Sequence, residues 1–250
     1  MSPLRFLAVA FALLPAFSAA AQMQVPAFPA EQRAAVRDVL VDNPEVLEVL
    51  VRHPEILQEA SHVLVKKEEA RRQALTSNAK ALFDDGVSYV AGNPKGDVTL
   101  VEFFDYRCGY CKQVQQSVMT LIKEDPKLRV VLKELPVLGP DSVLASRAAI
   151  AALEQDKGGK YLGFHNALMS FRGQLTEAEV FRIAAASGLD VTKLKADMAA
   201  PKVEQVIRAN LALAEKLGIN GTPGFVIGQE LIPGAISLES MRKLVQAARG

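Results

Sequence analysis

From residue 86 onward, apolar residues recur along this chain with two different periods, which distinguish strands from helices. Short apolar runs bounded by Gly, Pro or Asn predict strands, whereas apolar residues at every third or fourth position predict amphipathic helices. The run from Val98 to Phe104 is mostly apolar and contains Glu102, a pattern typical of a buried strand. The predicted strands are 87–90, 98–104, 128–132, 225–227 and 230–232.

Helical periodicity fills most of the remaining sequence. The predicted helices of this part of the chain are 108–123, 142–153, 160–170, 177–186, 191–198, 202–217 and 238–248. The order of elements is a strand, a strand–helix–strand unit, several helices, a hairpin and a final helix. This order predicts an α/β domain over residues 83–250, with a small central sheet and a helical insertion at about 140–217.

Residues 22–82 have a different pattern, which predicts an all-helical extension. The similar phrases Asn43-Pro44-Glu45 and His53-Pro54-Glu55 each put Pro and Glu where the first turn of a helix favours them. The predicted helices are 31–41, 44–51 and 54–83. Several apolar residues on them need a cover that short helices cannot supply alone: Val36, Leu40, Val46, Leu47, Leu50, Ile56, Leu57 and Leu64.

Two packing partners remain as alternatives for this apolar surface, namely the α/β domain or further copies of the same helices. The stretch 66–72 is charged on nearly every side and is expected to be a solvated spacer. A spacer separates the apolar residues from the α/β domain and so favours self-association.

The first residues predict a signal peptide. Arg5 is the only charged residue before Glu31, and the apolar run 6–17 is too short to span a bilayer. The small residues 18–21 favour cleavage after Ala21, with a short membrane anchor as the alternative. Residues 1–21 are therefore expected to direct export, most simply to a bacterial periplasm, where disulfides persist.

Composition narrows the class of protein. The 250 residues include 29 basic and 28 acidic side chains, and loss of Arg5 with the signal peptide would balance them. A balanced charge gives no support for nucleic acid or an anionic membrane as partner. Half of the residues are hydrophobic, which allows a sizeable core, and two cysteines are too few for a disulfide scaffold.

Those two cysteines, Cys108 and Cys111, stand where the strand 98–104 gives way to a helix. At a helix start, free backbone N–H groups and the helix dipole stabilise a thiolate, so Cys108 is the expected nucleophile. Cys111 follows one turn deeper on the same face and is the expected resolving thiol. The pair predicts a redox-active dithiol.

Two further features complete the requirements of thiol–disulfide exchange. Glu102 precedes Cys108 by six residues, and its burial would raise its pKa and let it relay a proton for Cys111. An edge-strand carboxylate that faces solvent is the alternative for Glu102. Thr222-Pro223, flanked by glycines and followed by a strand, predicts a tight turn whose backbone can pair with an extended client, or else an ordinary loop.

In these motifs the chain resembles the DsbA-like branch of the thioredoxin superfamily, over about residues 84–250. The resemblance implies a thioredoxin-like fold with a mixed sheet, catalytic Cys108, Cys111 and Glu102, and a cis peptide bond at Pro223. The helical N-terminal extension also resembles that of ScsC-type periplasmic disulfide isomerases or reductases. This second resemblance implies a homo-oligomer, with a trimer as the first expectation.

The residues around the motifs separate two activities. DsbA oxidases carry Pro-His between the cysteines, whereas Gly109 and Tyr110 here, with Thr222 before the proline, resemble DsbC-type isomerases. The absence of histidine predicts a weaker oxidant. A disulfide isomerase or reductase is therefore favoured over a dithiol oxidase, with Gly109, Tyr110, Thr222 and Pro223 expected to contact the client.

Metal binding is a third reading of the thiols. Structural zinc needs two more ligands, and none of the three histidines is near the cysteines in sequence, so no zinc site is expected. Two thiolates can hold cuprous ion, which leaves copper sequestration as the non-enzymatic alternative. No organic cofactor is implied. The expected partners are exported proteins that contain cysteine and a membrane thiol–disulfide reductase or oxidase.

Overall fold

The computed structural model describes residues 30–156 and 159–250, and the predicted signal peptide lies outside these ranges. The chain divides into two compact units, residues 1–62 and 63–250, each of which is described by itself. Among the described residues, none of the helices combines the length and the apolar character that crossing a bilayer would need.

The first unit contains helices α1 (Ala30–Asp42) and α2 (Pro44–Arg52) and the start of α3 (Glu55–Ser77), which confirms its predicted helical character. The long helix predicted over 54–83 is wrong in one respect, since it breaks at Asn78. The Asn78 side-chain amide donates to the Ala74 carbonyl oxygen at 2.8 Å, and the Asn78 backbone N–H donates to the same oxygen at 3.1 Å. A separate short helix, α4 (Ala79–Phe83), follows.

The second unit is built on a five-stranded mixed sheet in the order β1-β3-β2-β4-β5. The strands β2 and β3 are parallel, and the other neighbouring pairs are antiparallel. Predicted fold class and observed sheet agree, and β2 has its predicted bounds. The strands are β1 (Tyr89–Gly92), β2 (Val98–Phe104), β3 (Leu128–Glu134), β4 (Gly224–Ile227) and β5 (Glu230–Pro233).

The first strand begins two residues later than predicted because Asp85 organises a turn before it. The Asp85 carboxylate accepts hydrogen bonds from the backbone N–H groups of Val87 and Ser88 at 2.9 and 2.8 Å. In contrast, β3 continues two residues beyond its prediction, because it stays paired with β2 as far as Phe104.

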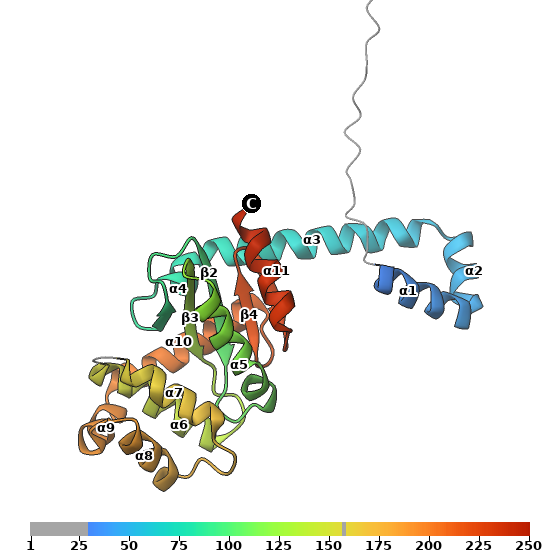
Figure 1. Ribbon diagram of the computed structural model, residues 1–250. Helices are drawn as coiled ribbons and strands as arrows, with labels where there is room; N and C mark the ends of the chain where they lie inside the picture. Colours follow the sequence, from blue (N-terminus) through green and yellow to red (C-terminus); the bar gives the residue numbers. More distant parts are fainter. Residues whose placement is uncertain (1–29, 157–158) are drawn as a thin grey trace, which may run out of the picture. The chain divides into compact units, whose positions relative to one another are not determined.

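Helices cover both faces of the sheet (Figure 1). Side chains of α5 and α11 share a core with one face, whereas the other face packs against the end of α3, α4 and α10. The helices between β3 and α10 form the rest of the insertion, at one end of the sheet. The helices are α5 (Gly109–Glu124), α6 (Pro140–Ala152), α7 (Lys160–Ser170), α8 (Glu177–Ala186), α9 (Val191–Met198), α10 (Pro201–Leu217) and α11 (Leu238–Arg249).

Side chains of β2 alternate between the two faces, and this alternation positions the acidic residue. Leu100 and Phe104 belong to the core shared with α5, whereas Val101 and Phe103 belong to the opposite core. With a period of two, Glu102 lies on the α5 face, together with Leu100 and Phe104. The edge-strand alternative for Glu102 is excluded, since β2 is central and the residue is fully buried.

Buried polar contacts attach the insertion to the sheet. The Tyr161 hydroxyl donates to Glu134 Oε1 at 2.6 Å, and Tyr106 Oη lies 3.1 Å from His165 Nδ1. Burial raises the pKa of Glu134 to about 7 and lowers that of His165 to about 3. His165, in the insertion, is fully buried, because α7 turns it into the core.

Candidate active site

The loop that carries the first cysteine is held by one buried carboxylate. Asp105, directly after β2, accepts hydrogen bonds from the backbone of Arg107 at 2.7 Å and of Val137 and Leu138 at 2.9 and 3.0 Å. The Ser142 hydroxyl also donates to Asp105, at 2.7 Å. Asp105 thus joins the cysteine loop to the connection between β3 and α6.

Cys108 is the N-cap residue of α5. The Cys111 amide N–H points at Cys108 Sγ, with a nitrogen–sulfur distance of 3.4 Å, and the Cys108 thiol donates to the Thr222 carbonyl oxygen at 3.1 Å. Cys108 retains 6% of its surface exposure, whereas Cys111 is fully buried. Cys108 is therefore the thiol that a disulfide of another molecule can reach.

Thr222 and Pro223 lie opposite Cys108, on the loop before β4. The peptide bond between them is cis, which confirms the geometry that the family resemblance implied. A hollow of about 220 Å³ borders this loop and is lined by residues 218–223, 233 and 234. Thr222 is half-buried and Pro223 is buried, so the hollow and the Thr222 backbone, rather than exposed side chains, border Cys108 on this side.

Glu102 and Cys111 are both sealed in the core. Neither carboxyl oxygen of Glu102 has a hydrogen-bond partner among the described residues. Burial raises the pKa of Glu102 to about 8. Burial, joined by the nearby charge of Glu102, also raises the pKa of the Cys111 thiol far above its usual range. The two groups therefore interact electrostatically, and both favour their protonated forms at neutral pH.

The two residues between the cysteines begin α5 on the molecular surface. Tyr110 is 66% exposed. A methyl group added at Gly109 would meet no atom within 4 Å, so no close contact requires glycine there. The structure brings five of the predicted residues together around Cys108, namely Gly109, Tyr110, Cys111, Thr222 and Pro223, with Glu102 beneath on the same face of the sheet as α5.

Sequence reasoning missed the residues that frame the cysteine loop. Asp105 could have been noticed as a carboxylate that directly follows a buried strand. Its partners Val137 and Leu138 gave no such signal, because they are more than thirty positions away in the chain. Among the described residues, no group of three or more His, Cys, Asp or Glu side chains gathers as a metal site would require.

Comparison with known families decides the class of this site. Residues 99–246, more than half of the chain, match the model of the DSBA-like thioredoxin domain. The chain belongs to the DsbA-like thioredoxin family. This family consists of thiol–disulfide oxidoreductases, and the matched range includes Cys108 and Cys111. The DsbA-like domain contains β2 and most of the other elements of the second unit, including the whole helical insertion.

Solved structures agree with this assignment. A thioredoxin-like oxidoreductase from Silicibacter pomeroyi DSS-3 is 47% identical, with a TM-score of 0.65, covering 68% of this chain and 96% of that one. ScsC of Proteus mirabilis in a transitional conformation is 31% identical with a TM-score of 0.66. That match covers 89% of this chain and 97% of ScsC, so the chain is of the ScsC type of DsbA-like protein.

A curated relative contains a similar segment as a small part of a much longer protein. The Na(+)/H(+) antiporter NhaA 3 of Salinispora tropica is 28% identical over 167 residues, which cover 66% of this chain but 25% of the antiporter. This chain therefore spans about a quarter of the length of the antiporters it matches.

Proposed function

We propose that the chain is an exported disulfide isomerase or reductase that acts on proteins with incorrect disulfides, most simply in the periplasm. One observation carries the proposal: the same chain contains a pair of cysteines suited to redox chemistry and N-terminal helices that expose aliphatic side chains. Isomerisation benefits when several redox pairs face the same client, and self-association supplies them. Dithiol oxidation makes no such demand on assembly.

The proposed chemistry begins with the Cys108 thiolate. Its sulfur attacks one sulfur of the client disulfide, so that a Cys108–client bond forms while the other client sulfur leaves as a thiolate. In isomerisation that thiolate attacks a second client disulfide, and the last thiolate formed displaces Cys108, with no net transfer of electrons. Electrons are conserved in each exchange, because every bond that forms replaces one that breaks.

In reduction, the resolving step belongs to Cys111. Its sulfur attacks Cys108 Sγ, the internal disulfide forms, and the client leaves with two electrons. Cys111 must lose a proton first, and the high pKa that burial gives its thiol makes an acceptor necessary. Glu102 is the proposed relay, because its carboxyl group faces α5 and lacks other partners among the described residues. With a pKa of about 8 it is ionised in a minority of molecules at neutral pH, and this ionised form takes the Cys111 proton. A membrane thiol–disulfide reductase is the proposed source of replacement electrons.

The surroundings of Cys108 support a polypeptide client. The Thr222 carbonyl oxygen and the hollow beside Pro223 offer backbone contacts, and Tyr110 exposes an aromatic ring at the rim. Val137 and Leu138 add exposed aliphatic surface on the loop that Asp105 ties to the cysteine loop. Misfolded proteins expose apolar segments of their own, and the apolar surface beside Cys108 is suited to contact with them.

The helices of residues 33–65 support self-association. Large aliphatic side chains remain exposed along α1, α2 and the first part of α3, and a free monomer would leave them in water. We propose a homo-oligomer that covers them, with a trimer as the first expectation. The exposed residues are Val36, Val39, Val41, Val46, Leu47, Val49, Val51, Ile56, Leu57, Val63, Leu64 and Val65.

Leu47→Glu tests the link between assembly and isomerisation. Leu47 is 46% exposed, so the substitution is tolerated by the single chain but buries a charge in an oligomer. We expect the mass measured by light scattering to fall to that of the monomer. We also expect refolding of scrambled ribonuclease to slow about tenfold or more, because separate redox pairs then act alone.

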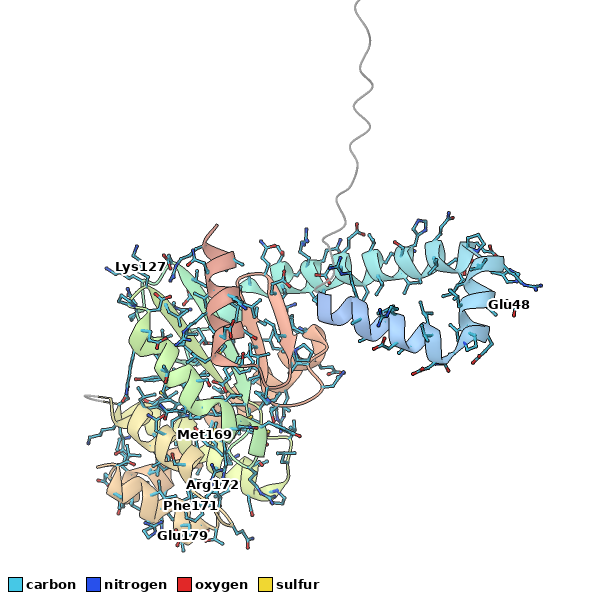
Figure 2. All side chains as sticks on the ribbon, turned by 45° about the vertical axis from the view of Figure 1, so that its right-hand side comes forward. Glu48, Lys127, Met169, Phe171, Arg172 and Glu179 are labelled. Atoms are coloured by element: carbon cyan, nitrogen blue, oxygen red, sulfur yellow. The ribbon has the colours of Figure 1, made fainter. Side chains whose placement is uncertain are left out.

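Glu48→Gln is the matched control, since Glu48 is a neighbouring exposed residue of the same helix (Figure 2). It should keep the oligomer and the refolding rate. Both variants should still reduce a small disulfide at the wild-type rate. A wild-type protein that is monomeric and only oxidises dithiols would contradict the proposal and favour an oxidase.

A further inference from the structure

Three cationic side chains lie near one another beside the start of α5, and the exchange chemistry itself does not use them. Arg107 directly precedes Cys108, and Lys112 follows it by four residues, one turn along α5. Arg172 comes from a distant part of the sequence, just after α7, where Figure 2 labels it beside Phe171. We call Arg107, Lys112 and Arg172 the basic rim.

Hydrogen bonds to two carbonyl oxygens hold the rim in place. Lys112 Nζ donates to the Phe171 carbonyl oxygen at 2.6 Å, which brings α5 against the residue that precedes Arg172. An Arg107 guanidinium nitrogen donates to the Leu138 carbonyl oxygen at 2.9 Å. Both cations are thus fixed at the edges of the cysteine loop by neutral oxygen atoms, and both keep their positive charge for another partner.

The carboxylates of Asp105 and Asp141 offset the positive charge of the rim only in part. Asp105 is buried and already accepts four hydrogen bonds. Asp141 lies 4.0 Å from Arg107 Nε, at the outer limit of an ion pair. Among the described residues, neither Lys112 nor Arg172 forms an ion pair. Burial lowers the pKa of Lys112, and the positive charges of Arg172 and Arg107 lower it further, whereas the negative charge of Asp105 raises it by less.

We propose that the basic rim selects client segments in which the half-cystine is flanked by Asp or Glu. The inference rests on the proposed function and adds the chemistry of the preferred client to it. Carboxylates on either side of the client sulfur would meet Arg107 on one edge and Lys112 and Arg172 on the other. Exposed charges around a binding site act mainly on the rate of encounter, and salt screens their effect.

Three peptides of equal length provide the probe. Each contains one cysteine as a thiopyridyl mixed disulfide, with acidic, neutral or basic residues on both sides. When reduced full-length protein attacks the peptide sulfur, a Cys108–peptide bond forms and thiopyridone leaves, and its absorbance reports the rate. At low ionic strength we expect the acidic peptide to react about tenfold faster than the basic one. High salt should remove most of this preference.

Arg172→Glu is the decisive variant, because Arg172 is exposed and forms no ion pair or hydrogen bond with another described side chain. We expect it to remove or reverse the preference for the acidic peptide and to leave the rate with the neutral peptide unchanged. Lys127→Glu makes the same change of charge before β3, at the end of the parallel β2–β3 pair remote from the cysteine loop (Figure 2). This control should keep the preference.

The outcomes separate this inference from the function on which it rests. Wild-type protein that reacts equally fast with all three peptides overturns the basic rim as a selector and leaves the disulfide chemistry intact. Arg172→Glu with an unchanged preference overturns it as well. Failure to react with any of the peptides would overturn the proposed function and this inference together.

Discussion

Replacing Cys108 by serine is expected to lower the rate of exchange with client disulfides about a thousandfold or more. A serine hydroxyl keeps the position at the start of α5 and can still donate to the Thr222 carbonyl oxygen, 3.1 Å from Sγ in the native protein. It cannot attack sulfur at neutral pH, because exchange requires a thiolate. The loss therefore reports the chemistry of one atom, with the surrounding contacts preserved.

Reduction of a peptide disulfide by the pre-reduced protein, followed in a single turnover, measures this effect. Tyr110→Phe is a suitable control, because it keeps the exposed aromatic ring next to Cys108 and removes only a hydroxyl group. The control is expected to react within about twofold of the wild-type rate, as for an ordinary surface change. Comparable activity in Cys108→Ser would mean that Cys111 attacks clients directly, contrary to its full burial.

The second large effect concerns the stability of the fold and its dependence on pH. Burial raises the pKa of Glu102 from 4.5 to about 8 in the folded protein. Between these two values the folded state binds a proton that the unfolded state has released. Stability therefore decreases as the pH rises from about 4.5 to 8, and this group adds no further change above 8. The shift corresponds to about 5 kcal/mol, at about 1.4 kcal/mol per pH unit.

Glu102→Gln keeps the shape of the side chain and removes its titration. We expect the variant to gain stability relative to the wild type as the pH rises, by up to about 5 kcal/mol between pH 4.5 and 8. Urea denaturation of both reduced proteins at several pH values measures the difference. Glu134, with a raised pKa of its own, titrates in both proteins and cancels on subtraction. Parallel stability curves would contradict the buried, raised pKa of Glu102.

The same substitution should slow the release of a bound client. If Glu102 accepts the Cys111 proton, Glu102→Gln should slow resolution of the Cys108–client disulfide about a hundredfold, a typical contribution of a positioned base. Formation of the mixed disulfide should stay at the wild-type rate, since only Cys108 takes part in it. Rapid-quench analysis separates the two steps, and equal slowing of both would point to a structural defect instead.

Much of this site could be predicted from local sequence, because its chemistry depends on short spacings. A buried strand, a turn and a helix start follow one another from Val98 to Cys111, so the pattern fixed where the sulfur atoms and Glu102 lie. The break at Asn78 was not predicted, since the apolar period continues through it. There the side-chain amide shares a backbone carbonyl oxygen with its own backbone N–H, a local contact that periodicity does not detect.

Long-range contacts explain what the sequence did not reveal. His165 carries no local sign of burial, and its position in the core depends on Tyr106, 59 residues earlier in the chain. The basic rim likewise depends on Lys112 reaching the carbonyl oxygen of Phe171. Such pairs form only when the insertion packs beside the cysteine loop, and no spacing along one segment encodes that packing.

The central claim is that Cys108 attacks the client and Cys111 releases it, and trapping tests this division most directly. Reduced Cys111→Ala and Cys108→Ala variants are each mixed with a disulfide-bonded client, quenched with acid and analysed by mass spectrometry. The account predicts that Cys111→Ala accumulates a stable mixed disulfide at Cys108, whereas Cys108→Ala accumulates none. A mixed disulfide formed through Cys111, or none in either variant, would contradict it.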